Sequence, residues 1–337
     1  MKISMKKPLG LVGISVVVLM ITVIYMLTVG TAAISPYRVF SIMAHKILFL
    51  ANPDIPVHEQ IIVWNFRWQR VALAILVGSG LAVTGASFQT MFKNPLADPF
   101  LLGVSSGAAL GAAIAIVTGH TELMVVLAFG GAACSLAVVY LIGQSSYERS
   151  DQQLLLAGIA CGALLNAILS AVMAMHSQQM QMIVFWLMGS LTNYVDSLTP
   201  IFAIVVICII IVMSYARDLD VIALGDDEAR YLGVDIDKIK PFLLIILSLM
   251  TGACVSVSGI IGFVGLIVPH IVRKIAGPTH LVLLPLSAIM GAVFLLVADG
   301  FTRSIPMLGS LPVGVVTALF GSPFFLYILY VAGRRVS

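Results

Sequence analysis

The chain has 337 residues, of which 60% are hydrophobic and only 10% are charged, and its mean hydropathy is +1.10. Soluble domains carry about 25% charged residues, so this composition excludes an ordinary soluble protein. Apolar runs such as 204–212 are continuous and do not alternate, which excludes a β-barrel. The composition therefore predicts an all-α polytopic membrane protein.

The apolar runs predict about ten transmembrane helices. The first follows a basic N-terminal segment and is too long for a typical signal-peptide core, although Ala32 and Ala33 resemble a cleavage site. We therefore expect an uncleaved first span with its N terminus in the cytoplasm. In chain order, the predicted spans are 8–29, 69–91, 101–117, 123–143, 154–175, 198–215, 241–258, a short span that follows 259–265 and ends near Arg273, 281–298 and 313–332.

The loops between spans divide the basic residues unequally. Residues 31–66 are predicted to lie outside the cytoplasm, with Trp64 and Trp68 at the membrane interface, and so is 176–193, which contains a short apolar piece around Trp186. The five basic residues outside are Arg38, Lys46, Arg67, Arg70 and Arg303. The other 13 lie inside, which agrees with the positive-inside rule and places both termini in the cytoplasm.

A charged region at 217–240 interrupts the apolar pattern, because it holds 11 of the 33 charged residues of the chain. Asp226, Asp227 and Glu228 favour a helix N-terminus, where the peptide dipole is positive, and Gly233 is a natural C-terminal stop. The segment from Gly225 to Gly233 is therefore predicted to form a helix of about two turns outside the bilayer. Two interpretations fit this region: a solvated loop, or a docking helix for a cytoplasmic partner.

Small residues also suggest an internal repeat at an offset of 174 residues. The matched pairs are Gly78 with Gly252, Gly85 with Gly259, Pro95 with Pro269, and Gly103 with Gly277. Spans 2 and 7 are five crossings apart and must run in opposite directions. The pattern thus predicts an inverted repeat of spans 2–5 and 7–10, an arrangement that transporters use.

Motifs for catalysis and metal binding are missing or poorly placed. The sequence has no P-loop, no His-Glu-x-x-His and no Cys-x-x-Cys, and its four cysteines lie singly in apolar runs. Gly103 to Gly107 matches the nucleophile-elbow pattern around Ser105, but it opens an apolar span, where small residues serve helix packing.

The acidic residues lie mostly at span ends. A proton-coupled carrier usually keeps a titratable group in mid-membrane, and the nearest candidates, His176, His270 and Asp299, lie close to predicted interfaces. This pattern predicts that the energy source belongs to another chain, which favours docking of 217–240 onto an ATPase.

Several long motifs resemble the FecCD-type permeases, the membrane subunits of bacterial ABC importers for vitamin B12, haem and iron-siderophores. The resemblance covers nearly the whole chain in order. It rests on Arg67-Trp68-Gln69-Arg70-Val71, Gly85–Gln89, Asn94-Pro95-Leu96-Ala97-Asp98-Pro99, Leu102–Ala108, Gly225–Val234, Gly262–Arg273, Ala298-Asp299 and Leu311–Thr317.

The resemblance implies a single transmembrane permease domain over 1–337, with a cytoplasmic coupling region at 217–240, in the bacterial cytoplasmic (inner) membrane. The implied partners are a second copy of the chain or a close paralogue, two cytoplasmic ATPase subunits, an extracytoplasmic substrate-binding protein and membrane lipid, but no nucleic acid. The chain would be a transport subunit rather than an enzyme. It would hold no cofactor, since the partner ATPase binds ATP and magnesium.

The resemblance also assigns residues to three roles. The ATPase-coupling residues are Gly225, Asp226, Asp227, Glu228, Ala229, Arg230, Leu232 and Gly233. The arginines that face the binding protein are Arg67, Arg70 and Arg303, which suit carboxylate partners. The cytoplasmic gate residues are Asn94, Leu96, Asp151 and Gln152. Asp151 and Gln152 stand where some relatives have small hydroxyl residues, so this gate is expected to be lined differently.

Simpler interpretations of these residues stay open. Arg67 and Arg70 are also suited to anchor span 2 at the membrane interface. Asp151 and Gln152 are also suited to cap the helix at the start of span 5. Asn166 suits either the pathway or an interhelical hydrogen bond. The methionines near the outer end of span 5 suit either a pathway for a large apolar ligand or helix packing. They are Met173, Met175, Met180, Met182 and Met188.

The leading hypothesis is the permease of a binding-protein-dependent ABC importer for a metal chelate such as an iron-siderophore, haem or cobalamin, with an oxyanion such as molybdate as a further possibility. The alternative is an autonomous secondary carrier or channel with its own ion coupling. A membrane-embedded enzyme is disfavoured, because the motifs offer it no better nucleophile than Ser105.

Overall fold

The computed structural model describes residues 6–30, 32–48, 55–144, 151–192, 199–304 and 311–333. Within these ranges the secondary structure is entirely helical. The helices are α1 (Lys6–Thr28), α2 (Pro36–Leu48), α3 (Val57–Ile61), the π-helix η1 (Ile62–Trp68), α4 (Gln69–Met91), α5 (Val104–Val117), the 3₁₀-helix η2 (Thr121–Leu123), α6 (Met124–Gln144), α7 (Asp151–Met175), α8 (Met180–Leu187), α9 (Thr199–Ser214), α10 (Ala216–Ile222), α11 (Asp226–Tyr231), α12 (Ile236–Ser258), α13 (Val264–Ala276), α14 (His280–Ser304) and α15 (Val313–Gly333).

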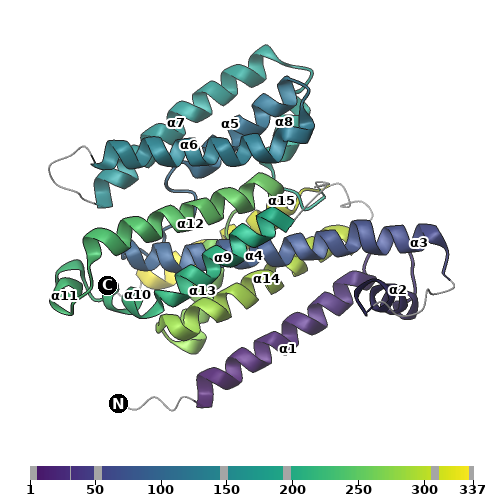
Figure 1. Ribbon diagram of the computed structural model, residues 1–337, viewed down its shortest axis with the longest axis horizontal. Helices are drawn as coiled ribbons and strands as arrows, with labels where there is room; N and C mark the ends of the chain where they lie inside the picture. Colours follow the sequence, from purple (N-terminus) through teal and green to yellow (C-terminus); the bar gives the residue numbers. More distant parts are fainter. Residues whose placement is uncertain are drawn as a thin grey trace.

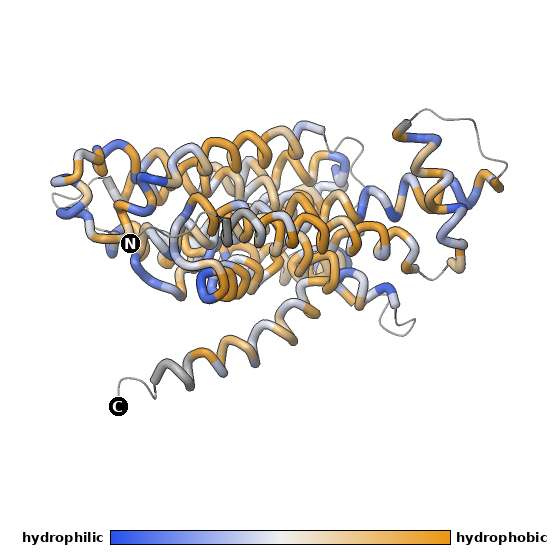
Figure 2. Tube along the Cα trace, turned by 90° about the horizontal axis from the view of Figure 1, so that it is seen from below, coloured by the Kyte–Doolittle hydropathy of each residue, from blue (hydrophilic) through white to orange (hydrophobic). Residues whose placement is uncertain are grey.

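The long helices lie roughly along one direction, with α4 at the centre (Figure 1). Helix α14 packs along α4, while α5, α6 and α7 pack on one another in a group on the far side of α12. Helix α1 flanks α14. Helices α2 and α3 lie at one end of the molecule, whereas α10 and α11 lie at the opposite end. Hydrophobic residues fill the middle of the bundle, and hydrophilic residues gather toward its two ends (Figure 2).

Ten helices occupy the positions of the ten predicted spans. Within the described residues, six of them are long and apolar enough to cross a membrane, and the pair α9 and α10, bent by 58°, makes a seventh. The other three are α5, α13 and α15. Helix α5 begins at Val104 rather than near residue 101, because Asp98 accepts a hydrogen bond from the Phe100 backbone N–H in a turn and Gly103 adopts φ of 71°.

Small residues explain how α4 can be buried among other helices. Gly78 lies against the backbone of Gly291 in α14, and Gly85 lies against the backbone of Gly265 in α13. A Cβ atom at either glycine of α4 would collide with main-chain atoms, so these crossings require glycine. The bundle core is therefore set by backbone contacts between α4 and its two neighbours.

The order of helices repeats in the two halves of the chain. Helices α4 and α12 both have 23 residues and run in opposite directions, and each is followed by a short helix, α5 or α13 (Figure 1). The register of 174 residues does not coincide with the helix ends, since Gly85 lies inside α4 whereas Gly259 follows the end of α12. The order of the helices therefore repeats between the two halves of the chain, whereas the matched glycines do not fall at equivalent places in those helices.

Candidate coupling site

The predicted helix in the charged region is present as α11, which begins after Gly225. Gly225 has φ of 152° and Gly233 has φ of 87°, both in the region that favours glycine. Arg230 pairs with Asp237 at 2.9 Å and so ties α11 to the first turn of α12. The coupling region is therefore a folded projection.

Exposed apolar side chains surround this charged helix. Tyr231 is 91% exposed, Leu232 is 62% exposed and Leu224 is 65% exposed. Ala229, in contrast, is fully buried and packs against its own subunit. The three exposed side chains form an apolar edge beside the charged helix, and Ala229 packs on its inner side. The ATPase-coupling role of this region stays a prediction.

Asp226 connects the coupling region to two other elements. Its carboxylate lies 2.7 Å from Nζ of Lys93, just after α4, and 2.9 Å from Nζ of Lys240 in α12. Partial burial alone would raise the pKa of Asp226, but the two ammonium groups hold that pKa below its usual value. Asp226 therefore stays ionised and joins α11 to the end of the central helix.

A second polar connection runs beneath the coupling region. Asp220 of α10 accepts hydrogen bonds from the backbone N–H of His280, at 2.7 Å, and contacts the ring Nδ1 at 2.6 Å. The other ring nitrogen lies 2.7 Å from the hydroxyl of Thr90 in α4. His280 and Thr90 are buried, so α10 is fixed to α14 and α4 by oriented hydrogen bonds.

Arg273 of α13 extends this network, because its guanidinium also donates to the hydroxyl of Thr90 at 3.4 Å. Its guanidinium donates to the side chain of Gln89, and to the carbonyl of Ala86 at 2.9 Å. The amide of Gln89 in turn donates to the carbonyls of Gly265 and Leu266, each at 3.2 Å. Helix α13 is thereby held to the same end of α4 that the coupling region contacts.

The predicted gate residues lie near these connections, and their gating role stays a prediction. Asn94 accepts a hydrogen bond from the backbone N–H of Leu96 at 2.9 Å, in the exposed loop that follows α4. Gln152 is exposed in the first turn of α7, and the side chain of Asp151 lies outside the described residues. Through the neighbouring Lys93, the Asn94 loop is linked to α11.

Asp98, in the same loop, gives the protein a predictable pH dependence. Burial raises the pKa of this carboxyl to about 6, although the Phe100 backbone N–H partly offsets that rise. An unfolded chain releases the proton near pH 4, so the folded chain holds the extra proton between about pH 4 and 6. Stability therefore falls as pH rises through this window.

We expect Asp98→Asn to remove the loss of stability between pH 4 and 6. The variant should also raise the free energy of unfolding at pH 7 by about 1–3 kcal/mol. Thermal unfolding in detergent between pH 4 and 7 measures the effect in both proteins. Identical pH profiles for the variant and the unchanged protein would contradict the assignment.

Two of the three predicted docking arginines, Arg70 and Arg303, pair with one buried carboxylate at the opposite end of the bundle, whereas Arg67 binds backbone carbonyls. Asp299 is fully buried and lies 2.5 Å from Nε of Arg70 and 2.9 Å from Nε of Arg303. Arg67 donates to the carbonyls of Leu27, Thr28 and Ala32, and Arg303 to those of Met26 and Val29. These residues, named the arginine cluster below, hold the C-terminal end of α1.

The three arginines differ in how deeply they are buried. Arg67 and Arg303 are almost fully buried and donate to backbone carbonyls, which fits the anchoring interpretation. Arg70 is more accessible and lines a cavity of about 500 Å³ together with Phe185 and Thr192. Contact with a binding protein stays a prediction for all three, and Arg70 is the best placed for it.

Arg67→Met is expected to lower the free energy of unfolding by about 2 kcal/mol, because it leaves buried carbonyls of α1 without donors. The exposed Lys46→Met, at the same end of the molecule, should change it little and serves as the control. An unchanged unfolding temperature for Arg67→Met would show that this arginine does not anchor α1.

Sequence reasoning did not identify Lys93 or His280 as parts of the site. It placed Asp220 and Lys240 in the charged region 217–240 but did not predict their partners, which packing brings to them. Gln89 and Arg273 stood inside two family-like motifs, which was a signal for their importance but not for their contact.

Comparison with known proteins agrees with this architecture. The model of the FecCD transport family matches residues 18–331. The cobalamin import system permease protein BtuC of Halobacterium salinarum is 42% identical over 281 residues, which cover 82% of this chain and 75% of that protein. The hemin transport system permease protein HmuU of Yersinia pestis is 40% identical over 278 residues, covering 79% and 83%.

A solved inward-facing structure, assigned to a metal-chelate type ABC transporter, superimposes with a TM-score of 0.82 at 29% identity, covering 96% of this chain and 99% of the other. The family match spans nearly all of the chain, and the fold agrees with it over the same length. This chain therefore belongs to the FecCD transport family and is a membrane permease rather than an enzyme.

Proposed function

We propose that this chain is the permease subunit of a binding-protein-dependent ABC importer that carries a metal chelate into the cytoplasm. The ATP would be hydrolysed by two separate subunits that dock on α11. The observation that carries the proposal is the folded projection itself, with Tyr231 and Leu232 exposed and Asp226 bonded toward α4 and α12. Cobalamin and hemin, which two relatives carry by name, are the first substrates to test, followed by ferric chelates.

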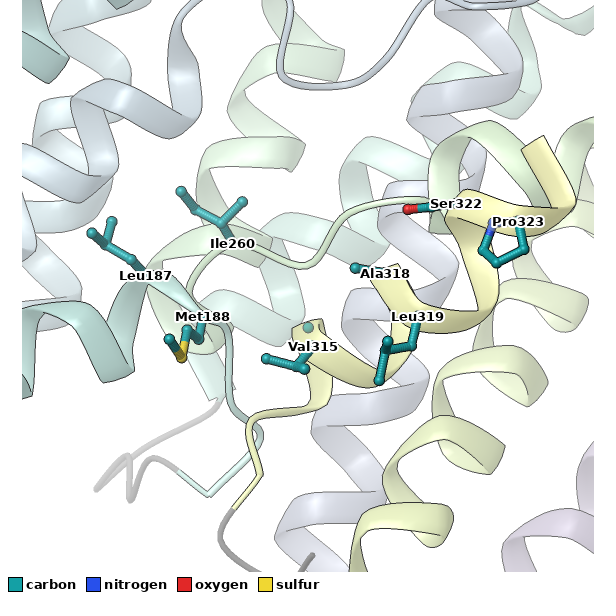
Figure 3. Close-up of a pocket in the computed structure, with 9 residues that line it drawn as sticks. Leu187, Met188, Ile260, Val315, Ala318, Leu319, Ser322 and Pro323 are labelled. Carbon is teal, nitrogen blue, oxygen red and sulfur yellow. The ribbon is translucent and has the colours of Figure 1, made fainter. Parts of the chain in front are cut away.

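A second copy of the chain would complete the transport pathway. Leu319, Leu326 and Tyr327 of α15 are 64–65% exposed. A cavity of about 520 Å³ lies beside this helix, lined by Met188 after α8, Ile260 after α12, and residues of α15 (Figure 3). In a homodimer, two such apolar faces would enclose a path for a large chelate, and Met188 would supply an adaptable wall.

The backbone around this cavity is closely packed. The Ser190 N–H donates to the carbonyl of Ser258 at 2.7 Å, and Gly314 lies against the carbonyl of Met188. The ends of α8 and α12 and the start of α15 therefore meet without intervening side chains. A small movement of α12, which begins beside the coupling region, would reach the cavity wall through these contacts.

The membrane orientation follows from charge. Helix α1 begins at the end of the bundle where α11 lies, and α15 runs toward that end (Figures 1 and 2). Since 13 of the 18 basic residues are assigned to this side, we place it in the cytoplasm, together with both termini. The arginine cluster then lies at the extracytoplasmic side, where a binding protein would dock.

Uptake into liposomes tests the proposal. We expect labelled cobalamin, hemin or ferric citrate to enter only when the chain is reconstituted with its ATPase, its binding protein and ATP. The same vesicles without ATP, and vesicles with this chain alone, are the controls. Uptake by the chain alone, driven by an ion gradient, would instead support an autonomous secondary carrier.

A further inference from the structure

An apolar groove lies between α1, α13 and α14, away from the coupling region and from the cavity beside α15. Its volume is about 430 Å³, within the range of ligand-binding cavities. Its walls include Ile14 and Val18 of α1, Ile271 and Ile275 of α13, and Met290 of α14. The groove is therefore framed by three helices of the apolar bundle.

The side chains that line the groove offer almost no hydrogen-bonding groups to water. Its one polar side chain is Ser15, whose hydroxyl already donates to the carbonyl of Val12 at 2.8 Å. Water in such a groove would lack hydrogen-bond partners, and an empty groove would lose the van der Waals contacts of its walls. Because these helices cross a bilayer, the occupant that suits the groove is a hydrocarbon chain.

The charges beside the groove favour an anionic headgroup. Lys274 is exposed in the last turn of α13, next to the lining residue Ile275. Neither α1, α13 nor α14 before Asp299 contains an acidic residue that would repel an anion. Arg273 donates instead to Gln89 inside the protein, whereas Lys274 is exposed.

We propose that this groove binds one acyl chain of an anionic phospholipid from the cytoplasmic leaflet, with the lipid phosphate beside Lys274. Basic residues between transmembrane helices at the cytoplasmic side are known determinants of binding to anionic headgroups. The lipid would fill the space between α1 and the bundle at the end opposite the arginine cluster. Together, protein contacts at one end and lipid at the other would hold α1 in place.

The sides of α1 provide a matched pair of variants. Val18 lines the groove, whereas its neighbour Val17 is 58% exposed and does not line it. Val18→Trp would occupy the space that the acyl chain needs, and Val17→Trp adds the same bulk on a face outside the groove. Lys274→Glu leaves the groove intact but reverses the charge beside it.

The experiment reconstitutes the full-length chain, with the subunits that co-purify, into nanodiscs of equal phosphatidylglycerol and phosphatidylcholine, and counts retained lipids by native mass spectrometry. We expect the unchanged protein and Val17→Trp to retain phosphatidylglycerol preferentially. Val18→Trp should lose this lipid several-fold, and Lys274→Glu should lower the preference for phosphatidylglycerol about fivefold.

Equal retention of both lipids by the unchanged protein would overturn the proposal, and so would unchanged retention by Val18→Trp. If Val18→Trp changed the number of chains per particle rather than the lipid count, the groove would be an interface between copies. Thermal unfolding confirms that each variant is folded, and Lys274→Glu, on the surface, tests the headgroup even if Val18→Trp is unstable. None of these readouts depends on transport.

Discussion

Leu232→Asp is expected to abolish ATP-driven uptake while the chain stays folded and inserted in the membrane. Leu232 is 62% exposed at the end of α11, beside Tyr231, so the new carboxylate stays in water in the free subunit. In the assembled transporter it would be buried against the ATPase without a partner. Loss of a central contact of this kind costs about 2 kcal/mol or more, which weakens docking about 30-fold.

Co-purification of the ATPase with the tagged chain measures this effect directly, alongside uptake. Lys238→Ala is the matched control, because Lys238 is an exposed residue of the same region that pairs only locally, with Asp235 at 2.8 Å. Normal uptake by Leu232→Asp with full recovery of the ATPase would show that α11 is not the docking helix.

Ala229→Arg would give a less informative result, even though Ala229 belongs to the same predicted set. Because Ala229 is fully buried, a large charged side chain there would overpack the contact between α11 and its own subunit. We expect that variant to lower the unfolding temperature as well as uptake, so a loss of transport could not be assigned to docking.

Lys93→Met is expected to uncouple the transporter: ATP hydrolysis continues, but uptake falls several-fold. The substitution removes the ion pair between the loop after α4 and Asp226 of α11. Both side chains are partly exposed, so the free energy of unfolding should change by less than about 1 kcal/mol. The expected defect is therefore in transmission of movement from α11 to the loop that carries Asn94 and Leu96.

A double-mutant cycle separates this link from independent effects. If Lys93 acts through Asp226, the double variant Lys93→Met with Asp226→Asn should transport no worse than Asp226→Asn alone. Arg217→Met is the control, since it removes a positive charge from an exposed position in α10, within the same charged region as Asp226. Additive losses in the double variant would show that the two residues act separately.

The sequence predicted the helices well where local chemistry determines them. Continuous apolar runs predicted the long helices, and three acidic residues between two glycines predicted α11. The start of α5 was predicted about three residues too early, because the turn around Asp98 and Phe100 depends on a side-chain hydrogen bond inside an otherwise apolar stretch. The presence of these helices was therefore determined by local sequence, whereas the start of α5 was not.

The candidate site was predictable in its position but not in its connections. The coupling region was recognisable from its charge density and its family-like motif. The partners of Asp226 and Asp220 were not, because Lys93 and His280 are brought to them only by packing of α4 and α14. The same limit applies to Arg67, whose partners are backbone carbonyls of α1, which no side-chain pattern indicates.

The central claim is that α11 connects this permease to an ATPase whose activity responds to a loaded binding protein. The most direct test is the ATPase activity of the co-purified complex, measured with and without the cognate binding protein carrying each candidate chelate. We predict that one loaded binding protein stimulates hydrolysis and thereby identifies the substrate, and that Leu232→Asp removes the stimulation. If no ATPase co-purifies with the unchanged chain, the coupling account is contradicted and the autonomous carrier takes its place.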